Sequence, residues 1–528
     1  MVVTVSPPAS DVGLAVLECG GNAVDAAVAT ALALAVTYPA AGNIGGGGFM
    51  LVWPGAGQEP VCIDYRETAP AAATPDMFLA DPARYSHKTV GVPGTLRGLE
   101  LAHRRWGKLA WRDVVSPAVA LAADGFAIDA ALAEDLDEVA GKPKSGAEFR
   151  RVLSRPEGGK WRAGDPLVQP DLAGTLRTIA DEGADAFYRG RVAEQVVAEM
   201  QAGGGLITAA DLAGYQAKVR SPIHGTYRGF DIYGPPPPSS GGTVIVEMLN
   251  VLENFDLARE GRFAPRTLHL MIEAMRRAYC DRARFLGDPD FVEIPPHLTS
   301  KEYARKLAAG IDLAKATPSA ALAPEVPLAP LEGESTTHFS IVDRGGMAVA
   351  NTYTLQEAFG ARVVVRGAGF LLNNEMTDFN ARPGHTDRRG TIGTAANVIS
   401  PGKRMLSSQS PTIVARDGRL HLVTGSPGGR TIPNTVLCVL VNVLDFDMDV
   451  RAAVDAPRMH NQWLPDRVTL ELGSEAQYAP LVKQLTALGH NVVAKPREQG
   501  DAHTIRVQGD RLHGAADMRQ TVGKAAGF

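Results

Sequence analysis

The sequence predicts a mixed α/β fold, and three observations support this prediction. Runs with helical spacing alternate with short strand-like runs over the first 130 residues. Strand-like runs dominate after residue 336, and a Pro- and Ala-rich stretch at residues 317–330 precedes that change. With 528 residues, 45% of them hydrophobic and 21% charged, the chain can bury a large globular core.

In the first part of the chain, residues 11–19 and 22–36 predict helices, and residues 49–53 and 61–65 predict short strands. The polar residues 142–162 predict a surface excursion. Further helices are predicted at residues 91–106, 111–123, 128–139, 169–184, 192–201, 243–253 and 266–286. The later strands are predicted at "HFSIVD", "MAVANTYTL", "PTIVARDG", "RLHLVTG" and "RVTLEL".

Composition excludes several functional classes. The formal charge of −5 gives no reason to expect nucleic acid or an anionic membrane as partner. The longest apolar run is Ala-rich and contains Asp25, which favours a buried helix over a membrane span. The four cysteines are far apart and form no CxxC pair, so a disulfide framework or zinc site is not indicated; they are predicted to be small buried residues. No metal or organic cofactor is implied.

Two glycine-containing motifs have ordinary explanations. "GNIGGGGF" (residues 42–49) lacks the Lys-Ser/Thr of a phosphate loop, so close backbone approach accounts for it better than nucleotide binding. "GPPPPSSGG" (residues 234–242) is either a polyproline ligand or a rigid connector into the next helix, with Ser239 or Ser240 as its cap.

Three other motifs offer groups for catalysis or binding. "GSPGG" (residues 425–429) contains Ser426, but it is not GxSxG and Pro427 lacks an amide, so Gly428 and Gly429 are better read as oxyanion donors. Glu375 and Asp378 lie three apart, where a solvated turn is the alternative. Ser407 and Ser408 pair two hydroxyls that could equally cap a turn.

Thr336 and Thr337 stand where the Pro- and Ala-rich stretch gives way to a strand. Threonine is common in strands, so an ordinary strand position is one interpretation. The other is a nucleophile, because the hydroxyl of an N-terminal threonine can attack while its own α-amine, with a pKa of about 8, takes the proton. An internal threonine obtains that amine only if the chain is cut before it.

The order of the motifs decides between these interpretations. The chain resembles the γ-glutamyltransferase (glutathione hydrolase) proenzymes of the N-terminal nucleophile (Ntn) hydrolase superfamily over nearly its whole length. The resemblance rests on "GGNAVDAAVA", "AGNIGGGGFM", "DYRETAP", "PPPPSSGG", "STTHFS", "LLNNEMTDF", "KRMLSSQSPTIV", "VTGSPGG" and "DAPRMHNQWLP". It implies a four-layer αββα sandwich within the α/β (α+β) class.

The resemblance also implies how the chain matures. Self-cleavage between Ser335 and Thr336 would give a large subunit of residues 1–335 and a small one of residues 336–528, intertwined as one unit. The pair would be a heterodimer, with further dimerisation left open. Thr336 would be the nucleophile in both steps, the Thr354 hydroxyl would bond to it, and Gly428 and Gly429 would supply oxyanion amides.

The implied substrate is a small γ-glutamyl donor such as glutathione, with water, an amino acid or a peptide as acceptor. Its zwitterionic head needs a cation, anions and neutral donors. Arg66, helped by Ser407 and Ser408, would bind the α-carboxylate, and Glu375 and Asp378 would hold the α-ammonium.

Two departures from the family pattern bear on specificity. Gln356 stands where the family commonly has Asn, which shifts an amide in the head site. Residues 380–397, the counterpart of a lid, contain no Tyr or Trp, so hydrolysis could outrun transfer. The alternatives are another Ntn acylase, cleaving a β-lactam side chain or a small amide, or an inactive binding protein. The compartment would be periplasmic or extracellular if a leader is missing and cytoplasmic if the chain is complete.

Overall fold

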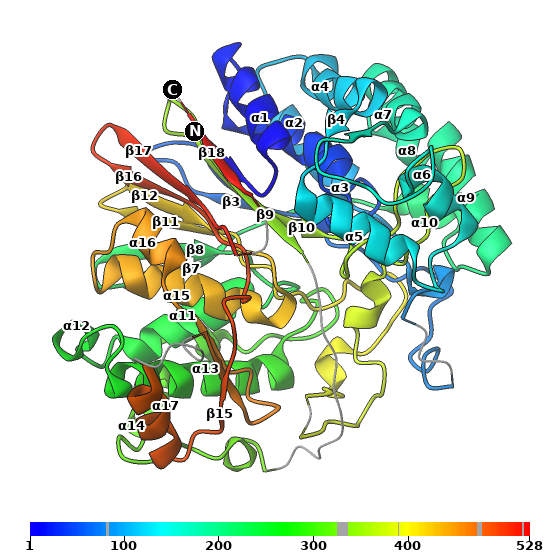
Figure 1. Cartoon of the computed structure of the whole chain (residues 1–528). Helices are drawn as coiled ribbons and strands as arrows, with labels where there is room; N and C mark the ends of the chain where they lie inside the picture. The colour runs from blue at the N-terminus through cyan, green and yellow to red at the C-terminus, as the bar shows by residue number, and fades with distance from the viewer. Residues whose placement is uncertain (81–83, 325–335, 389, 472–477, 520–521, 528) are drawn as a thin grey trace.

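A computed structural model describes the chain except for residues 81–83, 325–335, 389, 472–477, 520–521 and 528. Two β-sheets face each other at its centre (Figure 1). The first has the strand order β18-β1-β9-β10-β2-β3-β6 and the second β17-β16-β12-β11-β8-β7. The first sheet comprises β1 (Val2–Thr4), β2 (Gly47–Trp53), β3 (Val61–Asp64), β6 (Lys218–Arg220), β9 (Thr337–Val342), β10 (Ala348–Thr354) and β18 (Lys524–Ala526). The second comprises β7 (Ile223–Tyr227), β8 (Phe230–Gly234), β11 (Thr412–Arg416), β12 (Arg419–Thr424), β16 (His503–Gln508) and β17 (Arg511–Ala516).

Strand alternation gives each sheet two apolar faces. In β2, Phe49 and Leu51 point between the sheets, where they pack in one cluster with Ile413 of the second sheet. Met50 and Val52 point the other way and pack in a separate cluster with α2. A strand buried on both faces is therefore apolar throughout, as "FMLVW" is.

Helices cover the outer faces of both sheets (Figure 1). The first sheet is covered by α1 (Pro7–Glu18), α2 (Ala23–Thr37) and α3 (Thr95–Trp106), and the second by α11 (Gly241–Leu252), α15 (Ile432–Leu444) and α16 (Val450–Asp455), with α13 (Pro265–Phe285) packed against α11. Every residue of α2 is buried, and Asp25 forms a capping box with Asn22 at its start. Across the described residues, no helix has the length and apolarity needed to span a membrane.

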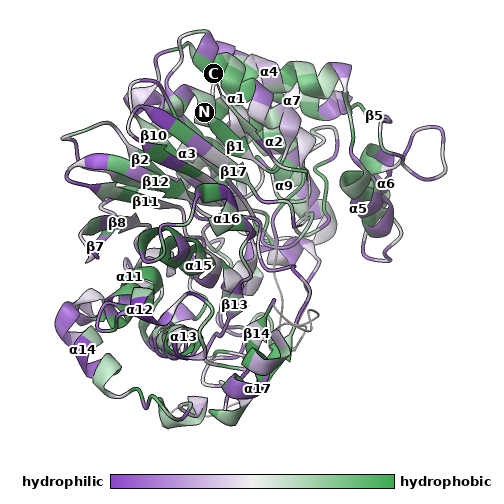
Figure 2. Cartoon of the chain, turned by 60° about the vertical axis from the view of Figure 1, so that its left-hand side comes forward, coloured by the Kyte–Doolittle hydropathy of each residue, from purple (hydrophilic) through white to green (hydrophobic). Residues whose placement is uncertain are grey.

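The mixed α/β prediction is confirmed, with two corrections. The excursion at residues 142–162 contains a helix, α6 (Ala147–Leu153), which lies with α5 (Ala130–Ala140) at the margin of the structure (Figure 2). Cys19 is exposed, whereas the other three cysteines are buried, so its prediction as a buried residue was wrong.

The glycine-rich segment before β2 runs against β10. A Cβ added to Gly46 would lie 2.0 Å from the carbonyl oxygen of Thr354, and one added to Gly48 would lie 2.3 Å from that of Thr352. Real side chains do not fit at such distances, so close backbone approach explains these glycines. This approach holds the end of β10, which carries Thr354, against β2.

Candidate active site

Thr336 and Thr354 meet at the adjoining ends of β9 and β10. These strands are antiparallel with Tyr353 opposite Thr337, so one further step in register places Thr354 opposite Thr336. Directly opposed residues share a face of the sheet, at Cα separations of about 4.5–5.5 Å. Thr337 points to the other face. Of the two adjacent threonines, Thr336 is therefore the one that faces Thr354.

The two threonines open into a small pocket. It is lined by Arg66, Thr336, Thr354, Gln356, Glu375, Asp378, Ser407, Ser408, Gln409, Gly429 and Ile432. All the predicted catalytic and binding residues except Gly428 are in this lining, and Gly428 adjoins Gly429. Ser335, on the other side of the predicted cut, lies outside the described residues. The cavity holds only about 10 Å³, so a γ-glutamyl head enters only if side chains move.

Gly428 and Gly429 form the turn between β12 and α15. Both have positive φ, 124° and 54°, a region that favours glycine. The Gly428 carbonyl accepts hydrogen bonds from the Thr431 N–H at 3.0 Å and the Thr431 hydroxyl at 2.8 Å, which fixes the turn. The following α15 begins at this point, and the amide groups at a helix start favour negative charge.

Ser426 is excluded as a nucleophile by its surroundings. It is fully buried, donates to the Pro427 carbonyl at 2.8 Å and accepts from the Asp501 N–H at 3.0 Å. Its hydroxyl therefore stabilises the loop that carries the two glycines.

Arg66 is paired with the two acids predicted to hold the ammonium. Its Nη1 lies 2.6 Å from Glu375 Oε1, and its Nη2 contacts Asp378 Oδ2. Its Nε donates to the Met405 carbonyl at 3.3 Å, and the side chain is 1% exposed. A bound zwitterion would exchange these ion pairs for its own, with its carboxylate on Arg66 and its ammonium on the acids. The same charges thus stabilise both the empty and the occupied site.

The sequence analysis missed Glu67, which lies directly behind Arg66. Its side chain is 0% exposed, one oxygen lies 3.5 Å from Arg66 Nη1, and neither oxygen accepts a hydrogen bond from the described donors. Burial raises the pKa of Glu67 to about 7, against the opposing effect of Arg66. Burial also raises the pKa of Glu375. The sequence signal that could have revealed Glu67 was a second charged residue next to Arg66, just after an apolar strand.

Glu67→Gln should therefore change stability in a pH-dependent way. A carboxyl whose pKa is raised from 4.5 to about 7 by folding is stabilising while protonated, and it destabilises the fold increasingly as pH rises through that window. We expect the advantage of Glu67→Gln over Glu67 to grow between pH 5 and 8, towards a limit of about 3 kcal/mol. Apparent melting temperatures, measured for both in a Thr336→Ala background so that neither chain is cut, test this. A pH-independent difference would contradict it.

The Pro-rich motif acts as a connector that holds the serine pair. The Ser407 N–H donates to the Pro238 carbonyl at 2.8 Å, and the Ser407 carbonyl accepts from the Ser240 N–H at 2.8 Å. Ser240 also donates its hydroxyl to that carbonyl at 2.7 Å and makes no side-chain cap to α11. Of the two serines predicted as the cap, it is Ser239 whose Oγ accepts from the N–H of Gly241, the first residue of α11, at 3.1 Å. Ser408 Oγ accepts from Arg282 Nη2 at 2.8 Å.

Gln356 lies between the threonine and the acids. Its backbone has a positive φ of 80°, its N–H donates to Thr354 Oγ1 at 2.8 Å, and its Nε2 donates to Asp378 Oδ1 at 3.3 Å. The extra methylene of glutamine still brings the amide to the head site.

One cluster in the described residues has metal-ligand types, but its atoms bind protein groups. His269, Glu273 and His490 are buried, with ligand atoms within 4.8 Å of one another. His269 Nδ1 and His490 Nε2 share a 2.8 Å hydrogen bond, and Glu273 forms ion pairs with Arg276 and Arg277. Two adjacent arginines disfavour a bound cation, so the cluster is best explained as a polar core contact of α13.

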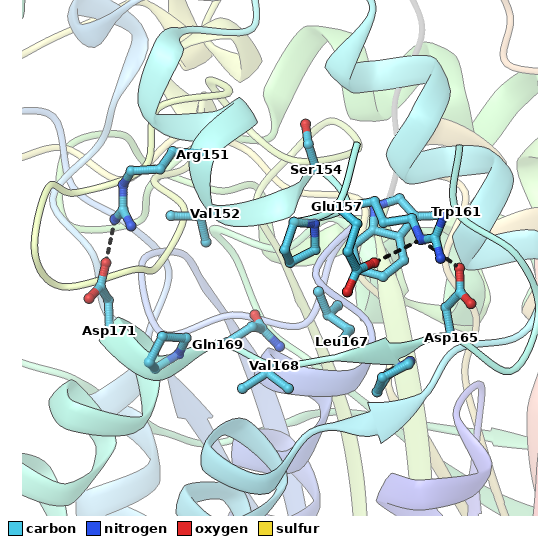
Figure 3. Close-up of a pocket in the computed structure, with 14 residues that line it drawn as sticks. Arg151, Val152, Ser154, Glu157, Trp161, Asp165, Leu167, Val168, Gln169 and Asp171 are labelled. Carbon is cyan, nitrogen blue, oxygen red and sulfur yellow. Dashed lines mark hydrogen bonds and ion pairs between the residues drawn. The ribbon is translucent and has the colours of Figure 1, made fainter. Parts of the chain in front are cut away.

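A larger cavity of about 420 Å³, which shares no lining residue with the threonine pocket, lies between α6 and the start of α7 (Pro170–Glu182) (Figure 3). Its arginines are already paired, Arg151 with Asp171 and Arg155 with Glu157 and Asp165. The volume of a cavity therefore does not identify the active site. The small pocket of Thr336 is the better candidate, because the predicted catalytic and binding groups meet there.

The sequence profile of the family described as Gamma-glutamyltranspeptidase matches residues 9–528. The chain belongs to this family. It is 47% identical over 538 residues to a glutathione hydrolase proenzyme of Escherichia coli, covering 100% of this chain and 92% of that protein. It is therefore an enzyme of the γ-glutamyl-transferring class.

Solved structures agree with this assignment. A cephalosporin acylase from Bacillus halodurans matches with a TM-score of 0.86 at 27% identity, covering 100% of this chain and 95% of that one. A γ-glutamyltranspeptidase chain from Helicobacter pylori matches with a TM-score of 0.57 at 43% identity, covering 59% of this chain and 91% of that one. The fold is thus shared by transpeptidases and acylases.

Proposed function

We propose that this member of the family is a self-activating glutathione hydrolase that also transfers the γ-glutamyl group. Thr336 Oγ attacks the γ-amide carbon, the C–N bond breaks, and the amine leaves with a proton. The resulting threonyl ester passes its acyl group to water or to the amine of an amino acid or peptide. The single observation that supports this most is the pocket that unites Thr336 with Arg66 and the acid pair.

The polar contacts suggest a role for each group in the reaction. Thr354 Oγ accepts from the Gln356 N–H, so its own proton can be donated to Thr336 Oγ across the strand pair. His338 cannot serve as a charged group, because burial holds its pKa well below the usual range, and its nitrogens contact Thr352 and Ser340. After the cut, the α-amine of Thr336 is the available base. The Gly428 and Gly429 amides would bind the oxyanion.

Cleavage between Ser335 and Thr336 would give subunits of residues 1–335 and 336–528. We propose that they remain one Ntn-type αββα unit and act together as a heterodimer. Sheet order supports this, because β9 and β10 of the small subunit lie between β1 and β2 of the large one. The Helicobacter pylori chain, which spans about the length of the large subunit, fits a family that occurs as two chains.

The acylase alternative shares the fold, so it differs only in the pocket. An acylase acting on uncharged or glutaryl side chains has no need of groups for an ammonium. Here Asp378 and Glu375 both line the cavity beside Arg66, which favours a zwitterionic γ-glutamyl donor.

Release of p-nitroaniline from γ-glutamyl-p-nitroanilide by the purified protein tests the proposal, and Arg66→Lys sharpens it. Lysine keeps the charge but lacks the planar fork, so kcat/KM for the donor should fall roughly tenfold or more. Self-cleavage should persist, because it needs no donor. Unchanged donor kinetics in this variant would remove Arg66 from the carboxylate site, and an inactive wild-type protein would refute the function.

A further inference from the structure

Among the described residues that line the Thr336 pocket, Gln409 is the polar one for which the proposed function has no role. Gln409 is 2% exposed, and neither its Oε1 nor its Nε2 has a hydrogen-bond partner in the described part of the chain. Buried side-chain amides normally have partners. An unpaired one that lines a binding pocket therefore indicates a partner that arrives with the ligand.

The backbone of Gln409 is fixed beside the pocket. Its N–H donates to Ser407 Oγ at 3.1 Å, and its carbonyl accepts from the Ser239 hydroxyl. A Cβ added to Gly241 would lie 2.4 Å from that carbonyl oxygen, so the start of α11 packs directly against it. The side chain, in contrast, makes no hydrogen bond that must break when the small cavity opens for a donor. A bound donor can therefore only add to its hydrogen bonds.

The polar groups of a γ-glutamyl donor can be matched one by one to groups of this pocket. In the proposed function, Arg66 and the serine pair bind the α-carboxylate, the two acids hold the α-ammonium, and the turn glycines bind the carbonyl oxygen. The donor group left over is the N–H of the scissile γ-amide. The protein group left over is the carboxamide of Gln409, whose oxygen is a hydrogen-bond acceptor.

We propose that Gln409 Oε1 accepts this N–H, which makes Gln409 a specificity-determining residue for γ-glutamyl amides. The proposal rests on the proposed function and deepens it, because the pocket then recognises the nitrogen of the bond that it cleaves as well as the head group. A site that hydrogen-bonds a substrate N–H discriminates against an analogue that lacks it, since the buried acceptor is left without a partner. An ester has an oxygen in place of that N–H. Gln409 therefore favours amides over the corresponding esters.

The test compares γ-glutamyl methylamide with the γ-methyl ester of glutamate, which differ only in this N–H and oxygen. Release of glutamate measures kcat/KM for both compounds. Gln409→Leu replaces the carboxamide with an apolar side chain of similar size. It should lower kcat/KM for the methylamide about tenfold, the effect of one hydrogen bond, and lower that for the ester by about twofold or less. An equal loss on both compounds would overturn the proposal, because they share the same head group.

Gln409→Glu is the matched control, because it keeps an acceptor oxygen at the same position. Its negative charge should slow both compounds, but its amide-to-ester ratio should stay within about twofold of the wild-type ratio. A ratio as low as that of Gln409→Leu would contradict the proposed hydrogen bond.

Two further measurements separate this inference from the function on which it rests. Self-cleavage needs no donor, so both variants should still be cut before Thr336; a variant that stays uncut would overturn the assignment of Gln409 to the substrate. Wild-type protein that turns over neither compound nor γ-glutamyl-p-nitroanilide would refute the function. Wild-type turnover of both compounds, with the same ratio in Gln409→Leu, would refute only this inference.

Discussion

Thr336→Ala is expected to remain a single 55.8 kDa chain without detectable activity, because it lacks the oxygen that attacks in both self-cleavage and catalysis. The wild-type protein should instead show two fragments on a denaturing gel. Prorated from 335 and 193 of 528 residues, they are roughly 35 and 20 kDa. N-terminal sequencing of the smaller should read Thr-Thr-His-Phe-Ser.

Thr337→Ala supplies the control for this experiment. Thr337 is adjacent in sequence, but its side chain points to the opposite face of the sheet from Thr354. It should still be cut before residue 336 and stay active. A fully active wild-type protein that is never cut, or a Thr336→Ala protein that is cut normally, would contradict the mechanism.

The second large effect concerns the donor's ammonium. Glutaryl-p-nitroanilide has the carboxylate and reach of the γ-glutamyl substrate but no ammonium. Its carboxylate would draw Arg66 away from Glu375 and Asp378 without compensating either acid. Charged groups left unpaired are strongly penalised, so we expect the γ-glutamyl anilide to be preferred by roughly a hundredfold or more in kcat/KM, about 3 kcal/mol.

Glu375→Gln combined with Asp378→Asn should narrow that preference, mainly by slowing the γ-glutamyl donor. Both substrates release the same chromophore, so one assay measures the ratio in both proteins. Equal turnover of the two substrates by the wild-type enzyme would show that the ammonium site is wrong. The protein would then be better described as a broad acylase on the transpeptidase fold.

Much of the site could be predicted from the sequence because its residues stand in short, ordered motifs. Arg66 and Asp378 are more than 250 residues apart, yet both line one pocket together with Thr336. Glu67 was missed because its role depends on burial behind Arg66, which no local pattern shows. The sequence predicted a cap at Ser239 or Ser240 without choosing between them; Ser239 Oγ accepts the Gly241 N–H, whereas Ser240 donates its hydroxyl to the distant Ser407 carbonyl.

The fold shows the same difference between features that depend on local sequence and features that depend on long-range contacts. Helices such as α2 and α13 were predicted within a few residues, because their spacing is local. The pairing of β1 with both β9 and β18 joins residues that are hundreds of positions apart. The three residues of β1 give no local signal of either partner. Such pairings depend on the packing of the whole core.

The interleaving of β1, β9, β10 and β2 has a consequence for recovery from unfolding. In the uncut chain, the linkage at residue 335 keeps the partner strands at high effective concentration, so the sheet assembles within one molecule. Once that linkage is gone, denatured fragments would have to find each other in solution, so the lifetime of the folded heterodimer would be set by its rate of unfolding. The proposed cut thus makes activation a one-way step: the active form keeps a structure that only its precursor assembles efficiently.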